Sequence, residues 1–216
     1  MEFLRPHRTI PSVPWSAQHR WQFSGMRTMI LITGLSFFGI GEALLVQSLL
    51  GNSPWTVLAQ GVSFKLNLPL GLVTGIISIV VLLFWIPLRE KPGLGTFFNI
   101  LVIPLSLQAA LSAVPEVHSF IAGLIFAFLG IAAIGMGSAL YISCHLGPGP
   151  RDGLMTALHH RTGIRVGRVR LFIEAVVFLI GWALGGRVGL GTALFALLIG
   201  QSIAISFGVV SRIATK

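Results

Sequence analysis

Two carboxylates lie within long apolar stretches of this chain, where a charged group is costly. Glu42 lies in the stretch 29–50, which contains no basic residue, and Glu174 follows Arg170 by one helical turn in the stretch 169–184. A charge at the centre of a bilayer costs on the order of 3 kcal/mol on insertion scales, so such residues mark functional sites. Glu42 is a candidate coupling residue whose natural counterpart is a proton or an ammonium group. Arg170 and Glu174 are either a structural i,i+4 ion pair or a second coupling site.

Two Gly-Pro segments carry the second group of candidate residues. Proline is favoured in the first turn of a helix, so short helices are expected to begin near Pro54 and Pro150 and to end near Lys65 and Arg161. Free N–H groups at a helix N-terminus bind anions, and the Arg151 guanidinium would add charge-assisted hydrogen bonds to a carboxylate or phosphate. The candidate substrate-binding residues are Asn52, Ser53, Gly147, Gly149, Pro150, Arg151 and Asp152. A small molecule with an anionic group is the substrate that this set favours.

Asp152 has a competing interpretation as a cap of its own short helix, because carboxylates favour helix N-termini. The polar residues in or near the apolar stretches are expected to hydrogen-bond between helices rather than to bind ligand. They are Gln47, Asn99, Gln108, Tyr141 and Gln201.

The composition identifies a polytopic membrane protein. Of the 216 residues 54% are hydrophobic and 10% are charged, whereas a soluble domain has about 25% charged residues. The net charge of +9 does not indicate nucleic acid, because the basic residues flank apolar stretches. No phosphate-loop lysine motif, HExxH or GxSxG motif is present, so we expect no enzyme activity, no cofactor and no metal site.

Six stretches are long enough to cross a membrane, which takes about 20 apolar residues. They are 29–50, 70–88, 95–114, 120–145, 169–184 and 190–210. With a cytoplasmic N-terminus, only Lys65 and Arg187 of the 15 Lys and Arg lie on the outer side, which leaves 13 (15 − 2) inside. This positive-inside bias predicts a multi-pass protein of the bacterial inner membrane with both termini in the cytoplasm.

The chain contains an internal repeat. A shift of 96 positions (130 − 34) places Gly34 on Gly130 and continues without a gap to Ile103 on Ile199. Each repeat holds three spans, and three is odd, so the second repeat enters the membrane from the opposite face. The predicted fold is therefore an all-α membrane protein of six transmembrane helices in two inverted three-helix repeats, an architecture of transporters.

The expected organisation follows from the repeat. A short broken helix comes after the first span of each repeat and is either re-entrant or lies at the membrane surface. The predicted segments are a basic cytoplasmic N-terminal segment (1–28), repeat 1 (29–104), a connector (105–129), repeat 2 (130–210) and a cytoplasmic tail (211–216).

One part of the second repeat resembles a known family. The run 146–155, Arg168-Val169-Arg170 with Glu174, and the block 189–192 are similar to the YczE-like (YitT-related) family of bacterial integral membrane proteins. The resemblance implies a transport-related membrane protein and names no substrate. The first repeat departs from this pattern, with Trp55 and Thr56 in the places of Arg151 and Asp152.

The resulting expectation is a small-molecule transporter or permease that alternates between its two repeats. The alternative is a membrane subunit or ligand-binding scaffold of a larger complex, such as the substrate-binding subunit of an uptake system. The expected partners are the lipid bilayer, a small-molecule substrate, and a second copy or a partner subunit, with no nucleic acid.

Overall fold

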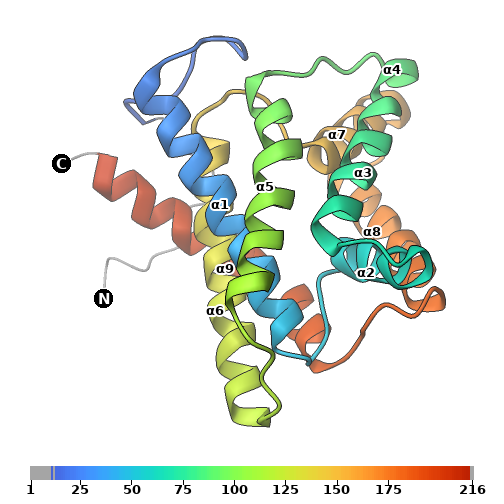
Figure 1. Ribbon diagram of the computed structural model, residues 1–216. Helices are drawn as coiled ribbons and strands as arrows, with labels where there is room; N and C mark the ends of the chain where they lie inside the picture. Colours follow the sequence, from blue (N-terminus) through green and yellow to red (C-terminus); the bar gives the residue numbers. More distant parts are fainter. Residues whose placement is uncertain (1–10, 12, 215–216) are drawn as a thin grey trace.

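The computed structural model describes residue 11 and residues 13–214, and every regular element in that part of the chain is a helix (Figure 1). The helices are α1 (Gly25–Gln47), α2 (Pro54–Leu66), α3 (Leu70–Leu83), α4 (Trp85–Leu88), α5 (Leu94–Ala113), α6 (Phe120–Ser143), α7 (Pro150–Thr162), α8 (Val166–Ala183) and α9 (Leu190–Ala214). The predicted all-α class is confirmed.

The two short helices begin and end where their sequence signals place them. A proline occupies the first turn of each, Pro54 in α2 and Pro150 in α7, and each helix has 13 residues. Their last residues are followed by left-handed backbone, with φ of 54° at Asn67 and 69° at Gly163. Such residues terminate helices because their N–H groups turn back to the last carbonyls.

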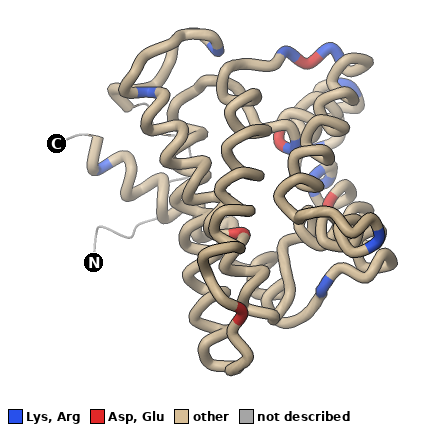
Figure 2. The backbone as a smooth tube through the Cα atoms, viewed as in Figure 1, with Lys and Arg blue, Asp and Glu red and all other residues tan. Residues whose placement is uncertain are grey.

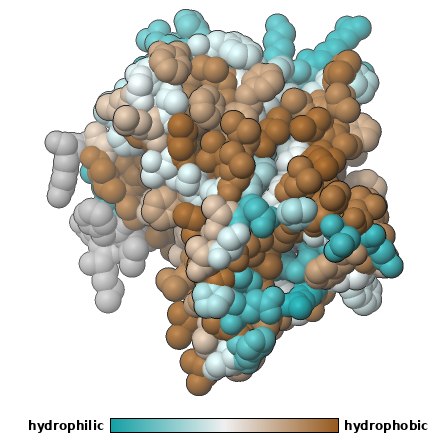
Figure 3. All heavy atoms as spheres, in the orientation of Figure 1, coloured by the Kyte–Doolittle hydropathy of each residue, from teal (hydrophilic) through white to brown (hydrophobic). Residues whose placement is uncertain are grey.

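Five helical segments are long and apolar enough to cross a membrane: Gly25–Gln47, Leu70–Leu88, Leu94–Ala113, Phe120–Ser143 and Leu190–Ala214. Apolar side chains cover the middle of the surface in Figure 3, and polar ones gather at its upper edge and lower right. These features make the chain a multi-pass helical protein. α8 is not among the five segments: its 18 residues include Arg168, Arg170 and Glu174, so a sixth span stays a prediction.

The helix boundaries repeat at an interval of 96 residues, and we call residues that far apart counterparts. α2 and α7 begin at counterparts, as do α3 and α8, and α5 and α9. The described residues with left-handed φ form four counterpart pairs: Leu49 and His145, Gly51 and Gly147, Asn67 and Gly163, Arg89 and Gly185. The two halves of the chain therefore have matching backbone paths, turn by turn.

The helices form two groups, each drawing on both halves of the chain (Figure 1). In the first bundle α1 packs against α5 and α6, and α6 packs against α9. In the second bundle α2 packs against α3 and α8, and α7 packs against α3 and α8. The bundles meet along α3 and α5, whereas no comparable packing joins α8 to α9, both of which are described in full.

Glycines hold α1 and α6 together. A Cβ on Gly34 would lie 2.9 Å from the Gly137 carbonyl oxygen, and one on Gly41 would lie 2.6 Å from the Gly130 carbonyl oxygen. Residue numbers rise along α1 as they fall along α6, so the helices are antiparallel. The absence of side chains allows the two backbones to approach this closely, as small residues do between membrane helices.

Residues 13–24 contact one end of α6 and the loop before α5. The Trp15 indole donates to the Ser143 hydroxyl at 3.1 Å, and Arg20 forms an ion pair with Glu90 at 3.0 Å. Lys and Arg are concentrated at this upper end of the molecule in Figure 2. Arg5, Arg8 and Lys216, which contribute to the predicted charge bias, lie outside the described residues.

Candidate functional site

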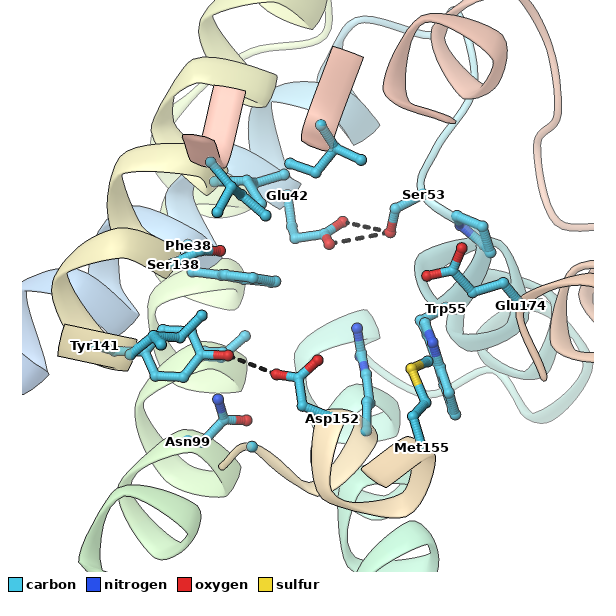
Figure 4. A pocket seen from close by; sticks show the side chains of 18 of the residues that line it. Phe38, Glu42, Ser53, Trp55, Asn99, Ser138, Tyr141, Asp152, Met155 and Glu174 are labelled. Atoms are coloured by element: carbon cyan, nitrogen blue, oxygen red, sulfur yellow. Dashed lines mark hydrogen bonds between the residues drawn. The ribbon is translucent and has the colours of Figure 1, made fainter. Parts of the chain in front are cut away.

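A cavity of about 240 Å³ lies between the two bundles and is lined by every long helix. Its charged lining residues are Glu42, Arg151, Asp152, Arg170 and Glu174. Its polar and aromatic lining includes Ser53, Ser78, Asn99, Ser138, Tyr141, Phe38, Trp55 and Phe195. Figure 4 shows Glu42 with Ser53 on one side of this space and Tyr141 with Asp152 on the other.

Glu42 of α1 is held by the N-terminus of α2. Its carboxylate accepts hydrogen bonds from the Ser53 hydroxyl at 3.0 Å and from the Thr56 hydroxyl at 2.5 Å. Glu42, Ser53 and Thr56 are each at most 3% exposed. Buried carboxylates need such donors, since an unsatisfied buried polar group is costly. The contact therefore joins the first bundle to the second.

Asp152 of α7 makes a related contact, in which the short helix carries the acid and the long helix carries the hydroxyl. The Tyr141 hydroxyl of α6 donates to the Asp152 carboxylate at 2.6 Å, so here the acid belongs to the short helix. Asp152 lies in the first turn of α7, as its capping interpretation requires, but its carboxylate makes no hydrogen bond to an N–H group of that helix, which is described in full. Tyr141 and Asp152 also line a second, neighbouring pocket with Arg20 and His145.

Arg151 of α7 lines the cavity between the two bundles. Its guanidinium carbon lies 5.0 Å from the centre of the Trp55 ring, a cation–π arrangement. Trp55 and Arg151 are counterparts, so corresponding positions of the two halves of the chain touch each other inside the cavity. The Arg151 guanidinium makes no hydrogen bond within the described part of the chain.

Two further lining side chains also have no hydrogen-bond partner among the described residues. They are the Asn99 amide of α5 and the Ser138 hydroxyl of α6, and Ser138 is only 3% exposed. Together with Arg151 they give the cavity three side chains with unused hydrogen-bond donors. Such a set suits a ligand with oxygen acceptors.

Arg170 and Glu174 form the predicted ion pair, with an Nε–Oε1 distance of 2.9 Å. Their side chains are 45% and 26% exposed and line the cavity. An exposed pair of this kind contributes little to stability. It makes the α8 side of the cavity polar.

The structure brings together most of the candidate residues predicted from the sequence. Glu42, Ser53, Gly149, Arg151, Asp152, Arg170 and Glu174 all line the cavity. Three do not. Asn52 donates to Gln60 at 2.9 Å, Gly147 lines the second pocket, and the Pro150 carbonyl accepts from the Trp85 indole at 3.0 Å.

Tyr141, Gln47 and Gln108 form hydrogen bonds between helices, as predicted. The lining residues that the sequence analysis did not assign to the site include Trp55, Asn99, Ser138 and Tyr141. A signal was available for two of them: Trp55 and Ser138 are the counterparts of Arg151 and Glu42. Among the described residues, no group of three His, Cys, Asp or Glu is placed to hold a metal ion.

Comparison with known proteins gives a family and three relatives of unknown function. The model of the "Family of unknown function (DUF6198)" matches residues 25–207. The chain is 41% identical over 206 residues to an uncharacterized protein of Haemophilus influenzae, covering 95% of this chain and 94% of the other.

Two proteins of Bacillus subtilis are more distant. The uncharacterized membrane protein YczE is 31% identical over 188 residues, 87% of this chain and 85% of the relative. The uncharacterized protein YyaS is 26% identical over 191 residues, 87% and 95% of the two chains. The resemblance to the YczE-like family is thus confirmed, and no solved structure matches the chain.

Proposed function

The chain belongs to the DUF6198 family of unknown function, and we propose that it is a small-molecule transporter of the bacterial inner membrane. The observation that carries this proposal is the cavity between the two bundles, which holds five Asp, Glu and Arg side chains inside an otherwise apolar helical protein. Ionisable groups at membrane depth are costly and mark substrate or ion pathways. A binding site at the interface of two repeats is the usual place in secondary transporters.

The contacts between α1 and α6 support an inverted repeat. Gly34 contacts Gly137, the counterpart of Gly41, and Gly41 contacts Gly130, the counterpart of Gly34. A two-fold axis requires this reciprocity, because each contact must occur twice with the partners exchanged. Since the helices are antiparallel, the axis would lie in the membrane plane, and the Trp55–Arg151 contact would lie beside it.

In this proposal α8 is the sixth span and both termini are cytoplasmic. Its 18 residues extend about 27 Å at 1.5 Å per residue, close to the hydrocarbon thickness of about 30 Å. Arg168 is exposed and would reach the cytoplasmic interface, while Arg170 and Glu174 face the cavity. α2 and α7 would be re-entrant helices, because they pack between spans and their N-terminal residues line the cavity.

The proposed substrate carries an anionic group. Arg151, Asn99 and Ser138 offer donors that no described residue uses, and a carboxylate or phosphate would accept them. Glu42 would be the coupling residue, since it is a buried acid in contact with both bundles and its charge depends on protonation. Without an ATP-binding motif, the energy would come from an ion gradient or from a partner.

Ligand binding is tested first, with purified protein and a panel of carboxylates, phosphate esters and amino acids in thermal-shift assays. Arg151→Ala should abolish the shift produced by an anionic hit. Arg161→Ala is the matched control, because Arg161 lies at the exposed end of the same helix and bonds only the Pro87 carbonyl. An equal shift in both variants would remove Arg151 from the site. Uptake of the hit into liposomes that contain this protein alone then tests transport.

The second candidate function is a ligand-binding subunit of a larger complex. The exposed faces of α8 and α9 favour it, because they offer room for another membrane protein. Binding without uptake in the same liposomes would support the subunit and contradict the transporter.

A further inference from the structure

The two bundles face each other along two pairs of helices, α3 with α5 and α8 with α9, and we call each pair a seam. The helices of one seam are the counterparts of the helices of the other. The α3–α5 seam is closed. A Cβ on Gly71 would lie 2.6 Å from the Pro104 carbonyl oxygen, and one on Gly75 would lie 3.7 Å from the Pro104 Cβ. Gly71 and Pro104 are buried. The two helices touch through backbone at this seam.

The α8–α9 seam is open at the corresponding positions. Gly167 and Gly200 are the counterparts of Gly71 and Pro104, and a Cβ on either would have no atom within 4 Å. Leu171, the counterpart of Gly75, is 73% exposed. The residues that close one seam are therefore exposed at the other, although the counterpart helices begin at corresponding residues.

The polar residues along the two seams also differ between the closed seam and the open one. Thr74 and Ser78 of α3 are 3% and 4% exposed, and their hydroxyls donate to carbonyls of their own helix. Their counterparts are Arg170 and Glu174, whose charged side chains line the cavity beside the open seam. A charged pair there indicates water or a polar occupant in the opening rather than lipid tails.

We infer that the α8–α9 seam is the mouth of the central cavity, and that a second conformation exists in which the two seams exchange states. In that conformation α8 packs on α9 with Gly167 against Gly200, and α3 separates from α5. Matching backbones make the two conformations similar in energy, as two halves of an inverted repeat require. The inference rests on the proposed transport function for its purpose, while its test measures conformation alone.

The α8–α9 seam has the parts needed to close. Two glycines allow backbone contact, as they do between α1 and α6. Arg170 and Glu174 already form an ion pair, so closure would bury a neutral pair rather than a single charge. Exchange would give the cavity one opening at a time, which a transporter needs.

Two pairs of engineered cysteines distinguish the conformations. Gly75→Cys with Pro104→Cys places the Cβ atoms about 3.7 Å apart, within the range of about 3.5–4.5 Å for a disulfide. This pair should form a disulfide readily on mild oxidation. Leu171→Cys with Gly200→Cys, the counterpart pair, should also form one, but about tenfold or more slowly, because the closed seam belongs to a conformation populated at about 10% or less.

The decisive measurement combines the two pairs in one protein. Mass spectrometry of the intact protein should find molecules that contain one disulfide or the other but no molecule that contains both, since closing one seam opens the other. Finding both disulfides in one molecule would contradict the exchange. So would a folded Leu171→Cys/Gly200→Cys variant whose cysteines react with maleimide but form no disulfide after prolonged oxidation.

Spin labels provide a second measurement that does not depend on disulfide chemistry. Labels at positions 171 and 200 should show two distances, and the shorter population should vanish when the Gly75–Pro104 pair is crosslinked. One unchanged distance would overturn the inference. If the seams exchange but no ligand is taken up into liposomes, the inference stands and the transport proposal fails. If ligand is taken up but the α8–α9 seam never closes, the transport proposal stands and the inference fails.

Discussion

At the scale of single residues, two acid–hydroxyl contacts connect the bundles, and they differ in which helix carries the acid. In the first repeat the acid is Glu42 on the long helix, with Ser53 and Thr56 as donors. In the second repeat the acid is Asp152 on the short helix, with Tyr141 as donor. A symmetric backbone therefore carries an asymmetric chemistry. The two contacts use different side chains, so the hydrogen bonds on one side of the cavity can break while those on the other side remain.

Thr56→Val tests the contact in the first repeat. It removes one buried donor from the Glu42 carboxylate at nearly constant volume, and a hydrogen bond to a charged group contributes about 1.5–3 kcal/mol. We expect the free energy of unfolding to fall by that amount, measured by thermal denaturation in detergent. Thr74→Val is the matched control, because this threonine is also buried but donates only to the Leu70 carbonyl of its own helix. Equal losses in the two variants would contradict a specific role for Thr56.

Cys144, the one cysteine of the chain, should not react in the folded protein. It lies just after α6 with no exposed surface, and burial raises the pKa of its thiol to about 12. The thiolate is the reactive form, so at pH 7.5 almost all of the thiol stays protonated. We expect no maleimide labelling of the native protein and complete labelling in SDS, measured by intact mass. Labelling of the native protein would show that this end of α6 opens.

The candidate site shows what the sequence can and cannot predict about single residues. Glu42 and the Arg170–Glu174 pair were identifiable because charge is rare in apolar stretches. Tyr141 was not, since its partner Asp152 lies across a loop and their contact depends on how α6 meets α7. The sequence likewise does not show that Arg151 lies against Trp55, because only the fold brings these counterparts together.

At the scale of helices, the glycines of the repeat serve two different purposes. Gly41 lies where α1 and α6 touch, and a Cβ there would lie 2.6 Å from a backbone oxygen. Gly200 of α9 has open space around it. Both are glycines in apolar helices, and only the structure separates a filled contact from an empty one.

Alanine substitutions at these two glycines should therefore have opposite effects. Gly41→Ala should destabilise the protein by about 1–3 kcal/mol, the usual cost of overpacking. Gly200→Ala should be neutral or stabilise it by up to about 1 kcal/mol, since alanine favours the helix. Thermal unfolding of both variants in detergent measures the difference. A loss of stability in the Gly200 variant as large as that in the Gly41 variant would mean that α9 is packed there.

Helix boundaries were predictable from local signals alone. α2 and α7 begin at Pro54 and Pro150, as predicted from the preference of proline for the first turn of a helix. The predicted ends near Lys65 and Arg161 lie one residue before the observed ones. The break between α3 and α4 was not predicted, since the stretch 70–88 is continuously apolar and carries no helix-ending signal before Pro87.

At the scale of the whole molecule, the sequence repeat predicts matching halves, and the structure shows where the match fails. The helices of the two seams begin at counterpart residues, yet one seam between the bundles is closed and the other is open. The two seams differ in their residues, with Thr74 and Ser78 on one side and Arg170 and Glu174 on the other, but only the structure shows which seam is closed. The departure from symmetry indicates a protein with two arrangements of the same parts.

The inverted topology itself has a direct test at the ends of the short helices. Lys65 and Arg161 are counterparts and are both exposed, near the ends of α2 and α7. In an inverted repeat they lie on opposite faces of the membrane, with Lys65 outside. A membrane-impermeant maleimide added to intact spheroplasts should label Lys65→Cys at once and Arg161→Cys only after permeabilisation, and Cys144 should give no background. Labelling of both cysteines from the outside would contradict the inversion, whereas the reverse pattern would keep the inversion and overturn the predicted orientation.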